Sequence, residues 1–194
     1  GAKDVYELNK LGEIQQWCYD NGRSFWEYVE KCEGKEIWDY LDMVWQTMKQ
    51  AIKNGLDHEG VLPGPLNLPR KAATYYTKAK GYRTSLQSRG LVYSYALAVS
   101  EENASGGTIV TAPTCGACGV LPAVLYHMHT SHDMSEQRIL RALATAGLVG
   151  NVVKQNASIS GADVGCQGEV GVACAMASAA ACQLFGGSPA QVEY

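Results

Sequence analysis

The sequence predicts an all-α fold, a compact multi-helix domain whose glycine-rich loops surround a buried central pair of helices. Two patterns point to this class. Apolar residues recur at three- and four-residue spacing over long segments, as they do on one face of an α-helix. The alternating pattern of a half-buried strand is not found over more than about five residues. Thr108–Ala112 is the best candidate for a strand, and it fits extended coil equally well.

Length and composition indicate one domain over residues 1–194. Of these residues 46% are hydrophobic and 18% are charged, which is enough to bury a sizeable core without disulfides. We expect amphipathic helices over residues 1–54, a loop rich in proline and glycine over 55–70, and a hydrophobic helical core over 71–194. From Val92 onward the sequence has few charges and many alanines and glycines.

The N-terminal third begins with two amphipathic helices. The first is predicted over Tyr6–Tyr19 and ends near Gly22, a residue type that commonly terminates helices. Ser24 and Glu27 have the spacing of a capping box, in which each side chain bonds the backbone of the other residue. A second helix is therefore expected to begin directly after Ser24.

A third helix is predicted over Glu36–Asn54, with Gly55 as its C-cap. Its apolar residues recur every three or four positions and form one stripe, which we interpret as a packing face rather than a cofactor site. The stripe comprises Ile37, Tyr40, Leu41, Val44, Trp45, Met48 and Ile52.

The loop that follows has repeated prolines and glycines, which prevent a regular element from continuing. Its polar residues, among them Asp57, His58, Glu59 and Arg70, are interpreted as a solvated connector before a basic helix start. Further helices are predicted over Val92–Asn103, Gly119–His129, Ser135–Val153 and Gly168–Phe185.

Composition excludes several classes of partner. A net charge of −3 without a basic stripe argues against nucleic-acid binding. The apolar run Val170–Phe185 is shorter than the roughly 20 residues that a membrane-spanning helix needs. An odd number of cysteines, seven, and no recognisable signal peptide point to the reducing cytoplasm. Small molecules and other protein chains are the partners that remain.

Cys166 lies in a glycine-rich loop that leads directly into an apolar helix. Backbone amides at a helix start lower the pKa of a thiol, so this cysteine is a candidate metal ligand or nucleophile. A small buried apolar residue is the simpler interpretation of a free cysteine. Lys154, at the close of the preceding apolar helix, fits either a base made neutral by burial or a partner of the helix dipole.

Two further motifs have more than one interpretation. Cys115 and Cys118 have the spacing of a redox dithiol or of half a zinc site, but a βαβ context and a second ligand pair are both absent. Their glycine-rich surroundings also suit a turn whose amides bind an anion such as a substrate carboxylate. The segment Glu101–Gly107 is interpreted first as a helix C-cap.

Four motifs in the same order closely resemble the α (catalytic) domain of bacterial iron-sulfur-dependent L-serine dehydratases. The resemblance covers about residues 55–194, and the aromatic N-terminal third matches more loosely. The motifs are Glu102-Asn-Ala-Ser-Gly-Gly, Val110-Thr-Ala-Pro-Thr-Cys-Gly-Ala-Cys-Gly-Val-Leu-Pro-Ala-Val-Leu, Asn156-Ala-Ser-Ile-Ser-Gly-Ala-Asp-Val-Gly-Cys-Gln-Gly-Glu-Val-Gly-Val-Ala-Cys and Gly186-Gly-Ser-Pro-Ala-Gln-Val.

The resemblance implies a 4Fe-4S cluster with Cys166 as its first thiolate ligand and no pyridoxal phosphate. The two other cysteine ligands are expected beyond residue 194, so the chain by itself is expected to lack the cluster and to be inactive. A β (regulatory) domain or subunit, which this chain does not contain, is also implied. Separately, the aromatic N-terminal helices lead us to expect a homodimer. Cys118, Cys174 and Cys182 are then interpreted as helix-packing thiols.

The implied reaction converts L-serine to pyruvate and ammonia, with the cluster iron as a Lewis acid. Catalytic candidates are Lys154, Ser158 and Ser160. Substrate-binding candidates are Asn156, Gly106, Gly107 and Thr114. Alternatives are an L-cysteine desulfidase on the same scaffold, a thiol-disulfide redox protein that uses Cys115 and Cys118, and a non-catalytic helical interaction module.

Overall fold

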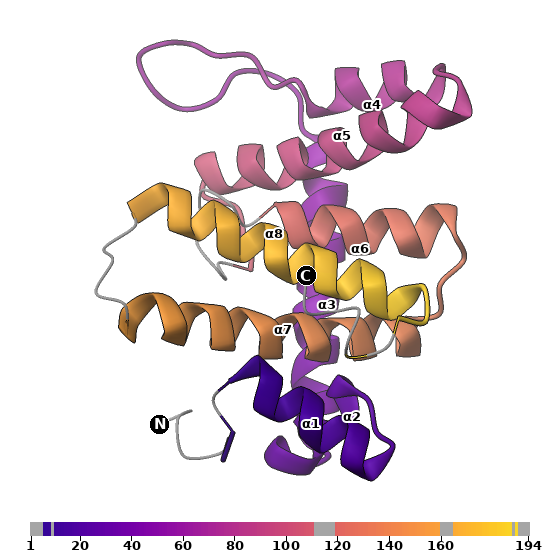
Figure 1. Ribbon diagram of the computed structural model, residues 1–194. Helices are drawn as coiled ribbons and strands as arrows, with labels where there is room; N and C mark the ends of the chain where they lie inside the picture. The colour runs from indigo at the N-terminus through magenta and orange to yellow at the C-terminus, as the bar shows by residue number, and fades with distance from the viewer. Residues whose placement is uncertain (1–5, 9, 111–118, 160–164, 188, 190–194) are drawn as a thin grey trace. The chain divides into compact units, whose positions relative to one another are not determined.

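The computed structural model describes residues 6–8, 10–110, 119–159, 165–187 and 189, and the all-α prediction is confirmed (Figure 1). Within these ranges there is no strand, and the only β-type pairing is an isolated bridge between Val61 and Pro69 in the loop before α4. The described helices are α1 (Leu11–Asn21), α2 (Phe25–Glu33), α3 (Ile37–Asp57), α4 (Ala72–Lys80), α5 (Thr84–Ala104), α6 (Val120–Ser131), α7 (Glu136–Ile159) and α8 (Gly165–Leu184).

The helices form two compact units. The first comprises Gly1–Asp42 and Met134–Tyr194, and the second comprises Met43–Asp133. In the first unit α2 packs on α7, and α7 packs on α8. In the second unit α5 packs on both α4 and α6.

Small residues allow α7 and α8 to approach closely in the first unit. A Cβ added at Gly150 would lie 2.6 Å from the sulfur of Met176 on the facing helix. Beside this contact the buried Thr145 donates a hydrogen bond to Gln183 at 3.1 Å. Arg138 donates to the last carbonyl of α8, at Leu184, which otherwise has no partner within its helix. These contacts hold α7 closely against α8.

The capping box is confirmed, whereas several helix boundaries differ from the predictions. Ser24 donates its backbone N–H and its hydroxyl to the Glu27 carboxylate at the start of α2. However, α1 begins at Leu11 rather than Tyr6, α5 begins at Thr84 rather than Val92, and α7 continues to Ile159. The turns added at the start of α5 are partly exposed, so they have no complete apolar stripe from which periodicity could detect them.

The stripe of α3 is a packing face, as predicted, with one exception. Trp45, Met48 and Ile52 are buried, but Tyr40 is 56% exposed. A tyrosine hydroxyl is well solvated, so an exposed tyrosine is less unfavourable than an exposed leucine or isoleucine.

Gly55 is not a C-cap, because α3 continues through it to Asp57. Its role is close packing in the second unit. A Cβ at this position would lie 2.4 Å from the backbone oxygen of Ala98 in α5 and 2.7 Å from the Ala98 Cβ. The helix therefore has glycine here because no side chain fits between α3 and α5.

Gly55→Ala is expected to destabilise the protein by about 2 kcal/mol, because the added methyl group must push α3 away from rigid backbone atoms of α5. Urea unfolding followed by circular dichroism measures the change. Gly12→Ala in α1 is the matched control, because a Cβ there meets nothing within 4 Å. The control should gain up to about 1 kcal/mol from the better helix propensity of alanine. Equal effects at the two glycines would contradict the close-packing explanation.

His127 is a buried histidine in α6, and no described residue hydrogen-bonds its Nδ1 atom. Burial lowers its pKa below the ordinary value, and the neighbouring His132 lowers it further. The ring is therefore neutral in the folded state near pH 7, whereas in the unfolded chain it takes up a proton near pH 6.5. Below that pH the unfolded chain binds a proton that the folded protein does not. The contribution of His127 to the free energy of unfolding is therefore complete above that pH and is lost as the pH falls toward the lower pKa of the folded state.

The free energy of unfolding is therefore expected to decrease between pH 7 and pH 5, partly through His127. His127→Phe fills the buried site without a titratable group, so its stability should depend less on pH over that interval. Parallel urea titrations of the two proteins at several pH values measure the difference. An unchanged slope in the variant would show that His127 does not contribute.

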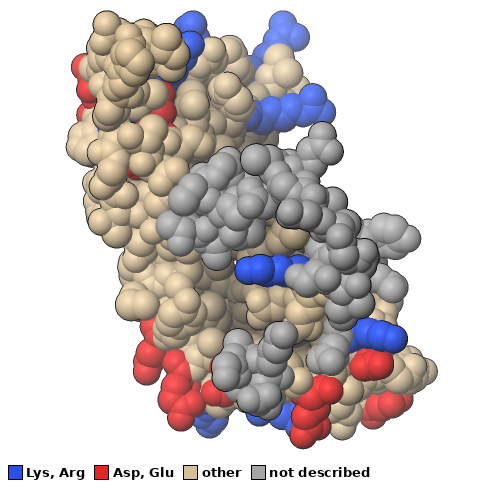
Figure 2. Space-filling view, turned by 90° about the vertical axis from the view of Figure 1, so that its left-hand side faces the viewer, with Lys and Arg blue, Asp and Glu red and all other residues tan. Residues whose placement is uncertain are grey.

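Charge is unevenly distributed along the chain. From Arg70 to Ser100 the sequence has several lysines and arginines but no aspartate or glutamate. In the space-filling view, blue side chains gather at the top, at the height of α4 and α5 (Figure 2). The net charge of −3 conceals this local excess of positive charge. Within the described residues, no helix has the length and apolarity that crossing a membrane would require.

Candidate functional site

The C-terminal end of α5 carries two adjacent buried carboxylates. Glu101 is 4% exposed and Glu102 is 3% exposed. Carboxylates are almost never buried unless hydrogen bonds or opposite charges compensate for the loss of water. Each of these two has such partners in the second unit. Together with His58, Arg70 and Ser105 they form what we call the Glu102 cluster.

Glu101 caps the neighbouring helix α4. Its carboxylate accepts the backbone N–H of Lys71 at 2.7 Å and that of Ala72 at 3.1 Å. The first N–H groups of a helix have no partner within the helix, and Lys71, the N-cap residue, provides no side-chain cap. The Glu101 carboxylate, which is distant in the sequence, therefore replaces a local N-cap side chain. It holds the start of α4 against the end of α5.

Glu102 accepts hydrogen bonds from two side chains. Arg70 donates from its guanidinium at 3.0 Å, and His58 Nδ1 lies 2.6 Å from the same carboxylate oxygen. The arginine side chain is only 8% exposed, so Arg70 and Glu102 form a buried ion pair. His58 is 57% exposed, so it lies at the solvent side of the cluster.

The same contacts hold the glycine turn that follows α5. Arg70 also donates to the hydroxyl of Ser105 at 2.5 Å, and that hydroxyl donates to the Glu101 carbonyl at 2.8 Å. Gly106 has a φ of 78°, a conformation that favours glycine. Gly107 donates its N–H to the Glu102 carbonyl, and a Cβ on Gly107 would lie 2.5 Å from the Glu102 carboxylate. The turn is thus fixed by buried charge and requires glycine at both positions.

The expected C-cap at the end of α5 is confirmed, but it is only part of the function of this segment. Ser105 and Gly107 donate backbone N–H groups to the last carbonyls of α5. Sequence reasoning noted Arg70, His58 and the two glutamates separately and did not connect them. A basic residue in a Pro/Gly loop and an acidic pair at a helix end are the only signals, and neither identifies its partner.

The structure brings two of the predicted site residues together, Gly106 and Gly107, in the turn next to the Glu102 cluster. Lys154 lies on α7 with an exposed side chain, so burial does not supply the desolvation suggested for a neutral lysine. Thr114 and Ser160, as well as Cys115 and Cys118, lie outside the described residues.

The remaining predicted residues lie where α7 ends and α8 begins. Asn156 and Ser158 are in the last turn of α7, and Cys166 is the second residue of α8. Their backbone is described, whereas their side chains are outside the described part. The roles assigned to these residues therefore stay predictions.

One prediction about the cysteines is wrong. Cys174 was expected to be a helix-packing thiol, but it is exposed on α8 because the buried face of this helix consists mainly of alanines. Cys182 is partly buried, as that interpretation requires. Cys18 is buried, and burial raises the pKa of its thiol to about 11. The described cysteines form no disulfide.

The described residues meet the requirements of a metal cofactor only in part. Among the described residues no three His, Cys, Asp or Glu side chains are grouped so that they could hold a metal ion. Cys166 occupies the first turn of α8, where the N–H groups that have no helical partner favour a thiolate. This position suits one thiolate ligand. A cluster needs more ligands than the described side chains provide.

The chain is similar to serine dehydratases in two kinds of comparison. A family model described as the serine dehydratase alpha chain matches residues 5–194. The chain is 46% identical to an L-serine dehydratase of Haemophilus influenzae and 45% identical to L-serine dehydratase 1 of Escherichia coli, in each case over 96% of this chain and 43% of the relative. It is 47% identical to an L-serine dehydratase of Streptomyces coelicolor over 81% of this chain and 35% of that protein. The chain thus spans less than half the length of these relatives.

Proposed function

This chain belongs to the serine dehydratase alpha chain family, and we propose that the protein containing it converts L-serine to pyruvate and ammonia. The observation that carries the proposal is the similarity to L-serine dehydratases over 96% of the chain. The fixed glycine turn beside the Glu102 cluster and the position of Cys166 at a helix start support it, because an iron-dependent route to these products needs a site for the substrate carboxylate and a ligand for the metal.

Cys166 is proposed as one thiolate ligand of a 4Fe-4S cluster. When bound, the cluster would supply an iron that acts as a Lewis acid on the substrate hydroxyl. Lys154, which is exposed on α7, is proposed to bind the substrate carboxylate through its ammonium group. Its other proposed role, acceptance of the Cα proton of L-serine, requires that bound substrate exclude water from the amine. Loss of that proton and of the hydroxyl leaves aminoacrylate, which tautomerises and hydrolyses to pyruvate and ammonia without further groups from the chain.

The remaining site residues are proposed to bind the substrate. Asn156, Ser158 and Ser160 would hydrogen-bond it from the end of α7 and the residues that follow. Backbone amides near Gly106, Gly107 and Thr114 would hold its carboxylate. The Gly106 and Gly107 N–H groups themselves donate to the carbonyls of Asn103 and Glu102. The Glu102 cluster supports the assignment because it fixes the backbone of this turn, beside which neighbouring amides would bind the anion in a set geometry.

The proposed β partner follows from the family, and the proposed homodimer follows from the aromatic N-terminal helices. A β (regulatory) domain or subunit is proposed to act together with this chain, and two copies are proposed to form a homodimer. We propose the cytoplasm as the location, and the unpaired state of the described cysteines supports a reducing compartment.

The test is anaerobic purification of the polypeptide that contains this chain, followed by iron and sulfide analysis and by assays of pyruvate release. We expect bound iron and sulfide, broad visible absorption and pyruvate from L-serine. Turnover of L-cysteine without turnover of L-serine would instead support desulfidation. A protein without iron and without activity toward either amino acid would contradict the proposal and favour a non-catalytic module.

A further inference from the structure

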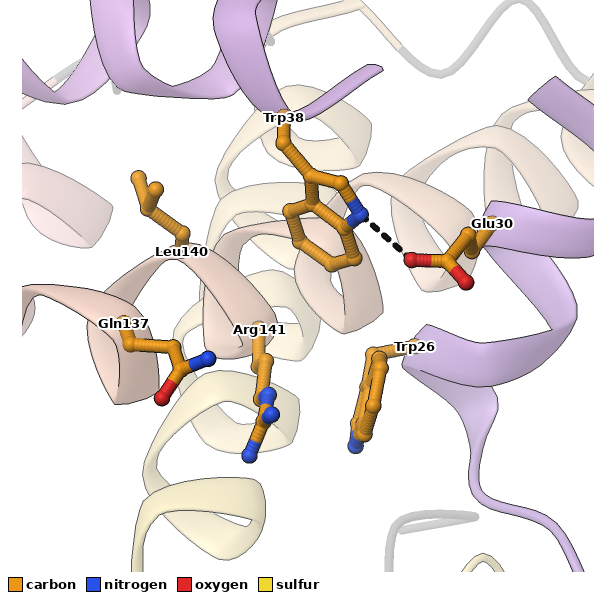
Figure 3. A pocket seen from close by; sticks show the side chains of 6 residues that line it. All are labelled: Trp26, Glu30, Trp38, Gln137, Leu140 and Arg141. Carbon is orange, nitrogen blue, oxygen red and sulfur yellow. Dashed lines mark hydrogen bonds between the residues drawn. The ribbon is translucent and has the colours of Figure 1, made fainter. Parts of the chain in front are cut away.

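A hollow of about 360 Å³ opens in the first unit, among α2, the first turn of α3, and α7. This volume is in the range of small-molecule sites. Its walls combine two tryptophans with a small number of polar groups. The lining residues are Trp26, Glu30, Trp38, Gln137, Leu140 and Arg141 (Figure 3).

The aromatic walls of the hollow are held in place by the protein itself. The indole N–H of Trp38 donates to the Glu30 carboxylate at 2.6 Å. Trp26 meets Trp38 edge to face, with ring centres 5.9 Å apart. Trp26 lies between Ser24 and Glu27, the two residues of the capping box, which fixes the start of α2 and so the position of this tryptophan. A ligand would therefore enter a preformed site and order few side chains on binding.

Arg141 brings a positive charge to the hollow. Its guanidinium lies 4.2 Å from the centre of the Trp26 ring, and no carboxylate in the described part of the chain pairs with it. When the face of a guanidinium lies on an aromatic ring, the N–H donors at the edge of the guanidinium remain available to a planar anion. Gln137 lies one helical turn earlier on α7, and its amide is directed toward Arg141 in Figure 3.

We propose that this hollow binds a small monocarboxylate with a planar apolar body. The Arg141 edge, with Gln137 beside it, matches a carboxylate, and bidentate pairing of that kind is strong and directional. Trp26, Trp38 and Leu140 offer a surface for the apolar body. Glu30 adds one negative charge to the lining, which disfavours phosphates and dicarboxylates. None of these residues has a part in the proposed dehydratase reaction, so this site stands independently of it.

The probe is phenylacetate, with its neutral isostere phenylacetamide and the cation phenethylamine for comparison. Isothermal titration and tryptophan fluorescence of the 194-residue protein measure the three dissociation constants. We expect saturable binding of phenylacetate with a dissociation constant of about 1 mM or below and at least tenfold weaker binding of phenylacetamide. Equal affinities for acid and amide, tighter binding of the amine, or no saturable binding of phenylacetate would overturn the proposal.

Substitutions test whether phenylacetate binds in this hollow. Arg141→Gln should abolish the preference for acid over amide, and Arg141→Lys should retain part of it, because lysine keeps the charge without the planar fork. Arg89→Gln removes a positive charge from an exposed position on α5 and should leave all three constants unchanged. Circular dichroism verifies that each variant is folded. If Arg141→Gln and Arg141→Lys both bind phenylacetate as the unmodified protein does, or if Arg89→Gln weakens binding equally, the carboxylate is not held by Arg141.

Discussion

Glu102→Gln is expected to destabilise the protein by about 3 kcal/mol, a large part of the stability of a typical domain. The substitution keeps the size of the side chain and removes its charge, which leaves Arg70 buried without its counter-ion. Removing one partner of a buried ion pair lowers the free energy of unfolding by more than the intact pair contributes, because the remaining charge is buried without water or a counter-ion. Urea unfolding followed by circular dichroism measures the change in the free energy of unfolding.

Two comparisons separate this effect from a general effect of charge. Glu59→Gln makes the same change at an exposed position of the adjacent loop and should alter stability by no more than about 0.5 kcal/mol. Arg70→Met should also destabilise, and the double variant should lose less than the sum of the two single losses, by about 1–3 kcal/mol. Simple additivity of the two substitutions would mean that Arg70 and Glu102 do not depend on each other.

The same substitution is expected to loosen the glycine turn. Arg70 donates hydrogen bonds to both Glu102 and Ser105. If its guanidinium moves, the turn loses both of these contacts. Hydrogen exchange of the Gly107 amide, which donates to the Glu102 carbonyl, should become faster in Glu102→Gln than in Glu59→Gln. This result would show that the buried carboxylate fixes the backbone proposed to hold the substrate.

The fold class could be predicted because local periodicity determines it. The stripe through Trp45, Met48 and Ile52 is visible in the sequence, and the same residues are buried in the structure. Helix ends were harder to predict, as Gly55 shows. A glycine near the end of a stripe suggests a C-cap, but this glycine is required by Ala98, a residue that is distant in the sequence. Close packing of this kind leaves no local signal.

The polar site could be predicted only in part, for a related reason. The ends of the Glu102–Arg70 pair are 32 residues apart, and those of the Glu101–Lys71 contact are 30 apart. Each residue alone fits a solvated loop or a helix end, which are the commoner settings for charged residues. The charge of the whole chain also concealed the cationic stretch around α4. Only the packing of α4 on α5 shows that Arg70 pairs with Glu102 and that Glu101 accepts the backbone N–H of Lys71.

Cys166→Ser is expected to abolish iron binding and L-serine turnover in the polypeptide that contains this chain. Serine is nearly the same size as cysteine, but its hydroxyl is not a thiolate at neutral pH and is a poor ligand for iron in a sulfur cluster. Iron content, visible absorption and pyruvate release after anaerobic reconstitution are the measurements. Retention of full iron content and activity would remove Cys166 from the cluster.

Cys174→Ser is the matched control, because both cysteines belong to α8 and Cys174 is exposed. The control should keep its iron, its absorption and its activity, since an exposed thiol two helical turns further on lies beyond the N–H groups that favour a thiolate at the helix start. A dithiol mechanism predicts the opposite arrangement: activity would survive Cys166→Ser and disappear in Cys115→Ser. The three variants together therefore distinguish a metal ligand at the start of α8 from redox chemistry at Cys115 and Cys118.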